Sequence, residues 1–557
     1  MSSLDIKIID KHLRNNKIIE ENFFVIDSDN LDSVDSHMYG FSISKSGIIT
    51  DNYYKEKGYY EEPFSQGTYV MIRKIGNEIR INQDFCGCYG IFIYQNKKKH
   101  YFALSNSFLL LQEYLSGKKK MTFNKEFADT LLVQRLVSPS IYETLIKEIT
   151  ILPSNSIAII NVLTKKLQVD YIDYKENSIP LESKKGIEII DNWIDKWGYI
   201  IRSLKKQTDN ISFDLSGGFD TRVTFSILLN SGIDLKSILI NTSKDLKHPD
   251  HFEDLKIATN ITSSYDLELN KRFLDNRSIL WDNEDIFCCS IYSKLGFHKE
   301  FNWKKQFYNT PRFSFTGHGG EIIRGFPGYP IHKYIENISL DGKKIRGYEK
   351  IYYSIKKLCD RSINLLKKAK KYNNDYEISS DLYFKGRTRY HFGKAAVEGF
   401  LSNIYFIQPL IDPDIKKIKY DINGKFSHDL IAFILFRYAR PLIDFPFQGN
   451  RLLNLESIKK AERLNKLIKP QKMSFDIYNK FYIDIQRLSP VTSSIGNESF
   501  QYFLEKLFRS AKFIQAVNKK YNKYIYYWVM KQNNKTNFFP LRHRYGLLAI
   551  AITSQNI

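Results

Sequence analysis

The chain has 557 residues, and 83 lysines and arginines against 61 aspartates and glutamates give it a formal net charge of +22. Hydrophobic residues make up 43% and aromatic residues 15% of the chain, which excludes an intrinsically disordered protein. The 28 glycines and 15 prolines exclude a collagen-like chain, and the five cysteines include no Cys-x-x-Cys pair. A disulfide framework and a zinc ribbon are therefore not expected, and roughly 150 residues per domain predicts two to four domains.

No apolar run approaches the roughly 18 residues that span a bilayer, and the N-terminus lacks the pattern of a signal peptide. We therefore expect a soluble cytoplasmic protein with no membrane partner. The positive charge would suit an acidic partner, but the lysines are scattered in ones and twos along the chain. Because a nucleic-acid interface needs basic residues clustered on one surface, we do not predict one. The sequence leaves a homodimer open.

Residues 1–178 predict an antiparallel, β-rich domain. Short segments rich in Ile, Val, Tyr and Phe alternate with Gly, Asn or Lys turns. The predicted strands are residues 23–26, 67–75, 77–83, 90–95, 101–105, 156–162 and 167–172. The polar stretch between Tyr174 and Lys185 is typical of a domain linker.

Residues 186–480 predict an α/β domain with a parallel sheet. Apolar residues at helical spacing indicate one long amphipathic helix that ends before Lys205. Strands and helices then alternate, which favours a parallel sheet with helices on its faces. The predicted elements are a strand at 210–215, a helix at 221–229, a strand at 235–241 and a helix at 252–261. Beyond about residue 348 we expect helices, and we expect residues 481–557 to form a helical extension of unknown role.

Residues 211–222 read Ile-Ser-Phe-Asp-Leu-Ser-Gly-Gly-Phe-Asp-Thr-Arg and carry the chemistry. A predicted strand ends at Leu215, and the glycines lead into a helix whose N-terminal N–H groups and dipole favour an anion. Gly217 and Gly218 let the backbone approach a phosphate closely. A carboxylate beside such a site, Asp220, needs a divalent cation to bridge it to phosphate oxygens. The segment is neither a Walker A loop nor a GxGxxG turn, and it predicts a polyphosphate bound with Mg²⁺.

A second glycine-rich turn follows another predicted strand. Residues 313–325 read Phe-Ser-Phe-Thr-Gly-His-Gly-Gly-Glu-Ile-Ile-Arg-Gly and present one acid, Glu321. The carboxyl ends of parallel strands meet at the edge where such sheets bind ligands. We therefore expect Asp220 and Glu321 to meet there and to share one or two Mg²⁺ ions.

These two turns resemble those of the asparagine synthetase family. The synthetase domain of that family is a PP-loop ATP pyrophosphatase, with SGG-x-D-S/T in its first turn and S/T-G-x-G-G/S-D/E in a later one. Residues 216–221 and 316–321 match these patterns, and the resemblance covers roughly residues 185–475. Weaker matches are Asp250 and Asp254 ahead of Ala258, residues 409–412, and residues 470–472.

The N-terminal domain is similar in outline to the glutaminase domain of the same family, a class II glutamine amidotransferase. Residues 83–87 resemble its RD-x-x-G turn, and residues 102–105 resemble the strand that follows. The family's nucleophile is a Cys after the initiator Met, where this chain has Ser2. This difference implies that glutamine hydrolysis is lost. Family members without that Cys, such as β-lactam synthetases and lasso-peptide cyclases, join a carboxylate to an amine.

The resemblance implies an ATP-dependent amide ligase. A substrate carboxylate attacks the α-phosphorus of ATP, pyrophosphate leaves, and an amine or ammonia displaces AMP from the acyl-adenylate. The resemblance assigns Mg²⁺ to Asp220 and Glu321. It assigns the nucleotide to Leu215, Ser216, Gly217, Gly218, Asp220, Thr221, Ile240, Thr316 and Gly317.

Three further residues are candidates for catalysis. His318 would deprotonate the amine as a neutral imidazole, or it makes a structural hydrogen bond in its turn. Lys472 would stabilise the developing negative charge, although Lys466 and Lys469 lie close by and a solvated surface lysine is the alternative. Arg222 would pair with a phosphate or the substrate carboxylate, or it forms a salt bridge to an acid at the sheet edge.

Two other functions stay open. A PP-loop enzyme that modifies tRNA would use the charge of +22, but such enzymes usually carry reactive cysteine pairs. A nucleotide-binding scaffold without chemistry is disfavoured because both candidate metal-binding carboxylates are present.

Overall fold

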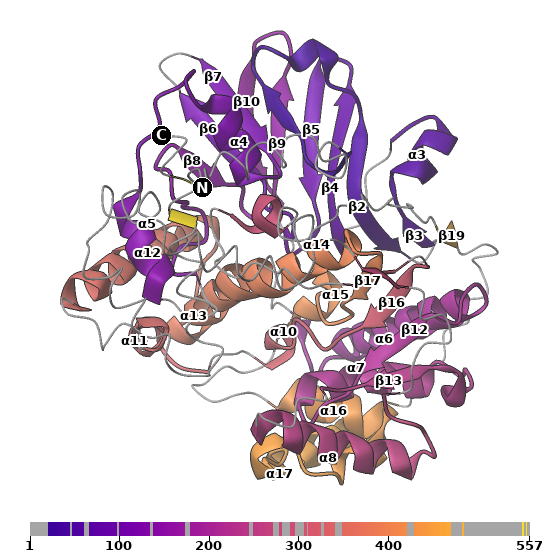
Figure 1. The fold of residues 1–557 in the computed structure, drawn as a ribbon. Coiled ribbons are helices and arrows are strands. Elements are labelled where there is room, and N and C mark those ends of the chain that lie inside the picture. The colour runs from indigo at the N-terminus through magenta and orange to yellow at the C-terminus, as the bar shows by residue number, and fades with distance from the viewer. Residues whose placement is uncertain are drawn as a thin grey trace, which may run out of the picture.

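The computed structural model shows a mixed α/β protein with an antiparallel sheet region near the N-terminus, a parallel four-stranded sheet later in the chain, and a helical C-terminal part (Figure 1). The structure describes residues 21–44, 47–60, 66–96, 100–133, 138–172, 179–243, 249–270, 278–280, 290–295, 306–308, 310–324, 328–339, 348–419, 428–468, 482–483, 549–550 and 553. Among the helices in these ranges, none combines the length and the apolar character of a membrane span.

Two sheets form the N-terminal part, at the top of Figure 1. The larger sheet has the order β10 (Lys166–Tyr171), β9 (Ser156–Asn161), β5 (Glu78–Gln83), β4 (Gln66–Ile75), β2 (His37–Ser44), β3 (Gly47–Ile49) and β19 (Tyr482–Ile483). The smaller sheet has the order β1 (Val25–Asp27), β7 (Tyr101–Ser105), β6 (Phe92–Asn96) and β8 (Ile149–Ile151). All pairs in both sheets are antiparallel except β19 with β3.

The larger sheet buries side chains on both of its faces. Val70 and Ile72 of β4 belong to the main core, which also contains the apolar side chains of the smaller sheet. Tyr69 and Met71 point to the other face, where they pack with Tyr54 of α3 (Asp51–Lys57). Because successive side chains of a strand alternate between faces, burial on both faces explains the continuous apolar run of β4.

Helices occur both within the N-terminal part and after it. Those before residue 270 are α4 (Phe108–Leu115), α5 (Lys125–Val133), α6 (Lys184–Lys205), α7 (Phe219–Asn230) and α8 (Pro249–Ser264). Those after it are α10 (Glu321–Arg324), α11 (Ile331–Ser339), α12 (Tyr348–Ala369), α13 (Asp375–Tyr383), the π-helix η5 (Phe384–Gly393), α14 (Lys394–Phe400), α15 (Pro413–Lys416), α16 (Asp429–Tyr438) and α17 (Leu455–Leu467).

Short elements complete the described chain. The 3-10 helices are η1 (Leu31–Ser33), η3 (Leu235–Ser237), η6 (Arg440–Ile443) and η7 (Gln448–Asn450). The two-stranded pairs are parallel β11 (Ile179–Pro180) with β18 (Ile418–Lys419), and antiparallel β14 (Ser278–Leu280) with β15 (Gln306–Tyr308).

The parallel sheet has the strand order β13 (Leu239–Asn241), β12 (Ile211–Asp214), β16 (Arg312–Phe315) and β17 (Ile404–Ile407). The chain leaves β12 through α7 to reach β13 on one side, and β16 later pairs with the other side of β12. The order of strands therefore reverses between β12 and β16. In open α/β sheets, the crevice at the carboxyl ends of such a strand pair is the usual place for a ligand.

Helix α6 supports this sheet and begins where its sequence predicts. The Ser183 hydroxyl caps the helix by accepting a hydrogen bond from the Gly186 N–H at 3.0 Å. Trp193 and Trp197 lie on the buried face, and the Trp193 indole donates to the Pro409 carbonyl at 3.1 Å. The ring of Trp197 meets that of Phe315 in β16 edge to face. The apolar stripe of α6 thus fixes both β16 and the loop after β17.

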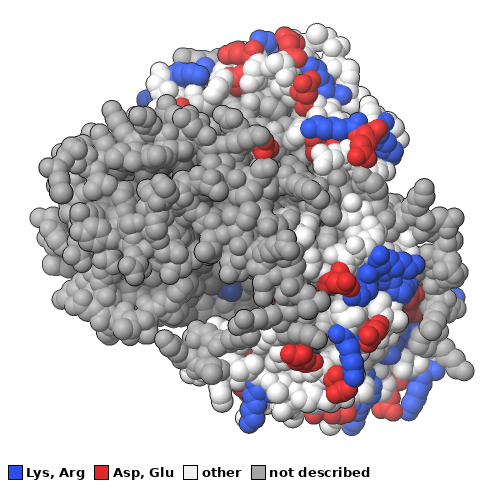
Figure 2. All heavy atoms as spheres, turned by 45° about the vertical axis from the view of Figure 1, so that its right-hand side comes forward, with Lys and Arg blue, Asp and Glu red and all other residues white. Residues whose placement is uncertain are grey.

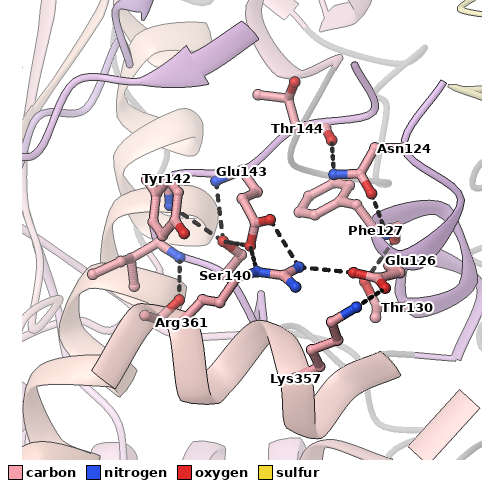
Figure 3. Close-up of polar contacts among 12 residues, drawn as sticks. Asn124, Glu126, Phe127, Thr130, Ser140, Tyr142, Glu143, Thr144, Lys357 and Arg361 are labelled. Atoms are coloured by element: carbon pink, nitrogen blue, oxygen red, sulfur yellow. Dashed lines mark hydrogen bonds and ion pairs between the residues drawn. The ribbon is translucent and has the colours of Figure 1, made fainter. Parts of the chain in front are cut away.

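Ion pairs join the N-terminal part to α12 (Figure 3). Arg361 Nη2 lies 3.0 Å from Glu126 Oε2 and 2.8 Å from Glu143 Oε1, and Lys357 Nζ lies 2.5 Å from Glu126 Oε1. Because these side chains are partly exposed, each pair contributes at most about 1 kcal/mol. Their joint effect is to hold α5 and the segment around Glu143 against one face of α12.

The predicted elements are largely confirmed. The strand predicted at 101–105 matches β7, and the helix predicted from residue 186 matches α6. The strand predicted at 235–241 is wrong in its first half, because residues 235–237 form a 3-10 helix. In the sheets of four or more strands, β2, β3, β8, β17 and β19 were not predicted. The helical extension predicted at 481–557 lies almost entirely outside the described residues, and it is wrong for Tyr482–Ile483, which form strand β19.

Candidate active site

The two glycine turns meet at the carboxyl ends of β12 and β16, as predicted. These strands pair directly, with Phe213 opposite Phe315. A Cβ atom on Gly320 would lie 1.9 Å from the Asp220 Cγ atom, and one on Gly317 would lie 2.7 Å from the Thr221 backbone nitrogen. No side chain fits at either glycine, so glycine is what allows the turns to touch.

The structure brings Asp220 and Glu321 together. Asp220 lies in the first turn of α7 and Glu321 is the first residue of α10. Asp220 Oδ2 accepts a hydrogen bond from Arg324 Nη2 at 2.7 Å. Asp220 Oδ1 and Glu321 Oε1 are enclosed, and neither has a hydrogen-bond partner among the residues that the structure describes. Two acceptor atoms are therefore left for a ligand.

The electrostatics of this pair follow from its burial. Burial raises the pKa of Asp220, although the Arg324 guanidinium opposes the rise. Burial also raises the pKa of Glu321 to about 7, and the nearby Asp220 charge adds to this. Two carboxylates held this close without a shared cation disfavour each other's ionised form. A bound cation would reverse the preference.

The pair fits part of a magnesium site. The described residues contain no group of three or more His, Cys, Asp and Glu side chains that could hold a metal ion. Mg²⁺ bound with a nucleotide, however, takes only one or two carboxylates and completes its shell with phosphate oxygens and waters. The free oxygens of Asp220 and Glu321 match this requirement, while Arg324 occupies the second oxygen of Asp220.

The N–H groups of the first turn are satisfied by the chain's own oxygens. The Gly217 N–H donates to Asp254 Oδ1 at 2.7 Å, and the Gly218 N–H donates to Ser216 Oγ at 3.1 Å. Thr221 Oγ1 accepts from the Ser216 N–H at 3.1 Å. The carboxylate of Asp254, from α8, thus occupies the position of an anion. A phosphate that takes the Gly217 N–H must displace it.

The loop before α17 covers this turn. The Gln448 N–H donates to the Gly217 carbonyl at 2.8 Å, and the Gly449 N–H donates to Glu253 Oε1 at 2.7 Å. The Phe219 ring stacks on Phe447 with centroids 4.1 Å apart. The first glycine turn is therefore packed between α8 and this loop, a contact that no sequence pattern indicated.

Arg222 does not reach the carboxylates. Its Nη1 donates to the carbonyls of Leu442 at 3.0 Å and Phe445 at 2.8 Å, and its Nη2 donates to the carbonyl of Pro446. The guanidinium lies 3.7 Å from the Phe447 ring centre, and burial lowers its pKa to about 9. Among the described residues its hydrogen-bond partners are backbone carbonyls. Neither predicted partner, a ligand at the carboxylates or an acid at the sheet edge, is therefore the one observed. Arg222 fixes the covering loop.

His318 lies on the far side of the second turn. Its Nδ1 is 3.3 Å from Gln408 Nε2, and its ring stacks on Phe392 with centroids 4.3 Å apart. Because an amide nitrogen only donates, Nδ1 accepts and the ring proton lies on Nε2. Burial and the charge of Arg387 lower the pKa of His318 to about 4. The imidazole is therefore neutral at pH 7, as expected, but it is too weak a base to suit proton removal from an amine. The geometry favours the structural hydrogen bond.

The remaining candidate residues continue the sheet. The Leu215 N–H donates to the Asn241 carbonyl at 2.8 Å, and the Thr316 N–H donates to the Ile407 carbonyl at 3.0 Å. Ile240 is buried in β13, and its carbonyl accepts from the Asn270 N–H at 2.7 Å. These backbone hydrogen bonds continue the pairing of the strands up to the glycine turns, so the candidate residues lie at the edge of the site.

The candidate lysines are not placed at the site. Lys472 and Lys469 lie outside the described residues. Lys466, in the last turn of α17, is exposed and pairs with Glu462 at 2.9 Å. Lys466 is therefore a surface lysine and not an active-site residue.

The N-terminal turn that resembles the glutaminase turn differs from the two glycine turns in that its carboxylate, that of Asp84, has both oxygens occupied. The Asp84 carboxylate accepts N–H groups from Cys86 at 3.0 Å, Gly87 at 2.8 Å and Cys88 at 3.1 Å on the two oxygens, and from Tyr69 at 3.1 Å. Both oxygens are occupied, and Arg389 donates to the Gly87 carbonyl at 2.9 Å. Ser2 lies outside the described residues.

Sequence reasoning missed two arginines at the site. Arg324 stands three residues after Glu321, a spacing that places both on one face of a helix. The sequence could therefore have predicted that Arg324 lies at the site. Arg387 lies near His318 and Glu321 but far from them in sequence, in a segment with no motif. No protein-family model matches the chain, and no curated protein matches it either.

Proposed function

We propose that this protein is an ATP-dependent, AMP-forming amide ligase that resembles asparagine synthetases and works without a glutaminase of its own. One observation supports this most: two carboxylates, each with one enclosed oxygen that has no partner among the described residues, lie where two glycine turns meet and the strand order reverses. That position suits the polyphosphate of a nucleotide. Its substrates would be ATP, a small carboxylate, and an amine or ammonia in the cytoplasm.

The proposed reaction has two steps. The substrate carboxylate attacks the α-phosphorus of ATP and pyrophosphate leaves; the amine then attacks the acyl carbon and AMP leaves. The N–H groups of Gly217 and Gly218 would bind the phosphate oxygens once Asp254 withdraws. Mg²⁺, held by Asp220 and Glu321, would neutralise charge on the pyrophosphate. Arg324 lies beside Asp220 and would add a second positive charge.

A pyrophosphate-release screen tests this proposal. The purified chain is given Mg-ATP with single amino acids or uronic acids, each with and without an amine, ammonium or glutamine. We expect release that depends on one class of carboxylate, with amide formed from an amine or ammonium and none from glutamine alone. Mg-ATP binding without carboxylate-dependent release would instead support a scaffold.

Modification of tRNA remains a second candidate because of the charge of +22. On the face in Figure 2, however, the basic side chains of the described residues lie interspersed with acidic ones. Purification decides: bound tRNA would give a high absorbance at 260 nm that falls when salt is raised. We expect no such absorbance.

A further inference from the structure

An unusual helix segment lies beside the candidate site. Residues Phe384–Gly393 form the π-helix η5, ten residues long. π-helices are rare, mostly span a single turn, and are frequent at functional sites. Arg389 of this segment donates to the N-terminal Gly87 carbonyl, and Phe392 stacks on His318. The segment therefore connects the N-terminal turn with the second glycine turn.

Arg387, in the middle of η5, contacts two aromatic rings but has no hydrogen-bond or ion-pair partner among the described residues. Its guanidinium lies 5.5 Å from the ring centre of Tyr383 and 5.6 Å from that of Phe392. Its Nε is enclosed, and the side chain donates no hydrogen bond and forms no ion pair with any residue that the structure describes. Arg222 and Arg324 also have an enclosed Nε, but their terminal nitrogens donate to carbonyls and to Asp220. A guanidinium offers five N–H donors, and no residue that the structure describes accepts a hydrogen bond from any of them here.

The position of Arg387 indicates which ligand. Its guanidinium lies 5.6 Å from the centre of the Phe392 ring, and that ring stacks on His318, so Arg387 lies close to the second glycine turn. The phosphate-binding turn of the proposed function is the first one, packed against Asp254 and Gln448. An anion at Arg387 would therefore lie beside the second turn, whereas the N–H groups assigned to phosphate belong to the first turn.

We propose that Arg387 binds the carboxylate of the acyl substrate, and this inference rests on the proposed ligase function. A guanidinium pairs with a carboxylate through two parallel hydrogen bonds, which orients the acid as well as binding it. The rings of Tyr383 and Phe392 hold the guanidinium in place through cation–π contacts. The substrate class is thus a small organic acid recognised by one fixed arginine.

Binding measurements on the full chain test Arg387 directly. The variants are Arg387→Gln, Arg387→Lys and, as a matched control, Arg463→Gln, which removes an exposed arginine of α17. Each protein is titrated by calorimetry with Mg²⁺ and the non-hydrolysable analogue AMPCPP. Each is then saturated with that nucleotide and titrated with L-aspartate, L-glutamate, succinate and glucuronate.

We expect at least one acid to bind the wild type saturably and to bind Arg387→Gln at least about tenfold more weakly. Arg387→Lys should lie between them, Arg463→Gln should match the wild type, and the AMPCPP affinity should be the same in all four proteins. Equal acid affinity in the wild type and Arg387→Gln would overturn the inference, as would no acid binding to the wild type. Weaker AMPCPP binding by Arg387→Gln would also overturn it, by assigning the arginine to phosphate.

The same titrations separate this inference from the proposed function. If wild-type protein binds acids through Arg387 but releases no pyrophosphate from ATP with the acids that bind, the ligase function fails and the acid site stands. If pyrophosphate release depends on an acid whose affinity Arg387→Gln leaves unchanged, the ligase function stands and Arg387 is not its receptor.

Discussion

Asp84 and Asp220 both lie in glycine-containing turns at strand ends, one after β5 in the antiparallel part and one after β12 in the parallel sheet. The Asp84 carboxylate accepts N–H groups of four residues and has both oxygens occupied. Asp220 Oδ2 accepts a hydrogen bond from Arg324, whereas Asp220 Oδ1 has no partner among the described residues. The nearby Glu321 Oε1 also has no partner among them. The Asp84 turn satisfies its own hydrogen bonds, whereas the Asp220 turn leaves an acceptor atom that a ligand could use.

The difference separates a stabilising role of a buried aspartate from a functional one in two glycine-containing turns. A buried carboxylate with all its hydrogen bonds stabilises the fold, since its acceptors replace water for several amides. A carboxylate with an unsatisfied oxygen costs stability, and a fold keeps it where it binds something. Substitutions at the two turns should therefore have opposite consequences.

Asp220→Asn should produce the largest effect on activity. We expect carboxylate-dependent pyrophosphate release to fall at least about a hundredfold, since the cation loses a charged ligand. The melting temperature should hardly change, because the variant removes a costly enclosed charge along with one partly exposed ion pair. A coupled pyrophosphate assay and thermal melting by circular dichroism measure both. Activity near the wild-type level would show that Asp220 holds no essential cation.

Asp84→Ala should produce the largest effect on stability. The N–H groups of Tyr69, Cys86, Gly87 and Cys88 would lose their acceptor inside the core, which costs about 3 kcal/mol or more in the free energy of unfolding. Urea denaturation measures the loss, with the exposed Asp29→Ala as a control that should change little. Folded Asp84→Ala should still bind Mg-AMPCPP like the wild type. Weaker nucleotide binding at unchanged stability would reverse the comparison.

Glu321 should make stability depend on pH in the metal-free protein. Its pKa is about 7 in the folded chain and 4.5 in the unfolded chain, so between these values the folded state binds more protons. Stability is therefore highest below pH 4.5 with respect to this group and falls by about 3 kcal/mol as the pH rises past 7. Urea denaturation in EDTA at pH 5 and pH 8 should show a smaller fall for Glu321→Gln. Equal falls in both proteins would mean that the carboxyl is solvated.

Arg222→Met should have a smaller effect, on stability alone. Three backbone carbonyls, those of Leu442, Phe445 and Pro446, lose a charged donor, and we expect a loss of about 2 kcal/mol. The affinity for Mg-AMPCPP at a temperature where the variant is folded should stay within about threefold of the wild type. A large loss of affinity with unchanged stability would restore Arg222 to the site.

The sequence predicted the meeting of the two turns because of a general rule of parallel sheets. Strands such as β12 and β16 place their carboxyl ends at one edge, so two glycine turns after such strands come together. The long helix α6 was equally readable from its apolar spacing. Strand β17 was missed because its four residues stand alone between helices and carry no alternating pattern.

Side-chain partners could not be read in the same way. Arg222 was assigned to an anion because it closely follows Asp220, but residues two positions apart on a helix point about 200° apart. Its partners, residues 442–446, are more than two hundred positions away in sequence. The same holds for Asp254, which was matched to a helix but whose hydrogen bond to Gly217 no spacing predicts. Arg387 depends on a π-helix, a conformation without a sequence signature.

Calorimetric titration of the metal-free full chain with AMPCPP, with and without Mg²⁺, tests the central claim most directly. The double variant Asp220→Asn/Glu321→Gln is titrated in parallel. The account predicts that Mg²⁺ strengthens nucleotide binding to the wild type at least about tenfold and leaves binding to the double variant unchanged. The same magnesium dependence in both proteins would contradict it, because the two enclosed carboxylates would then hold no cation.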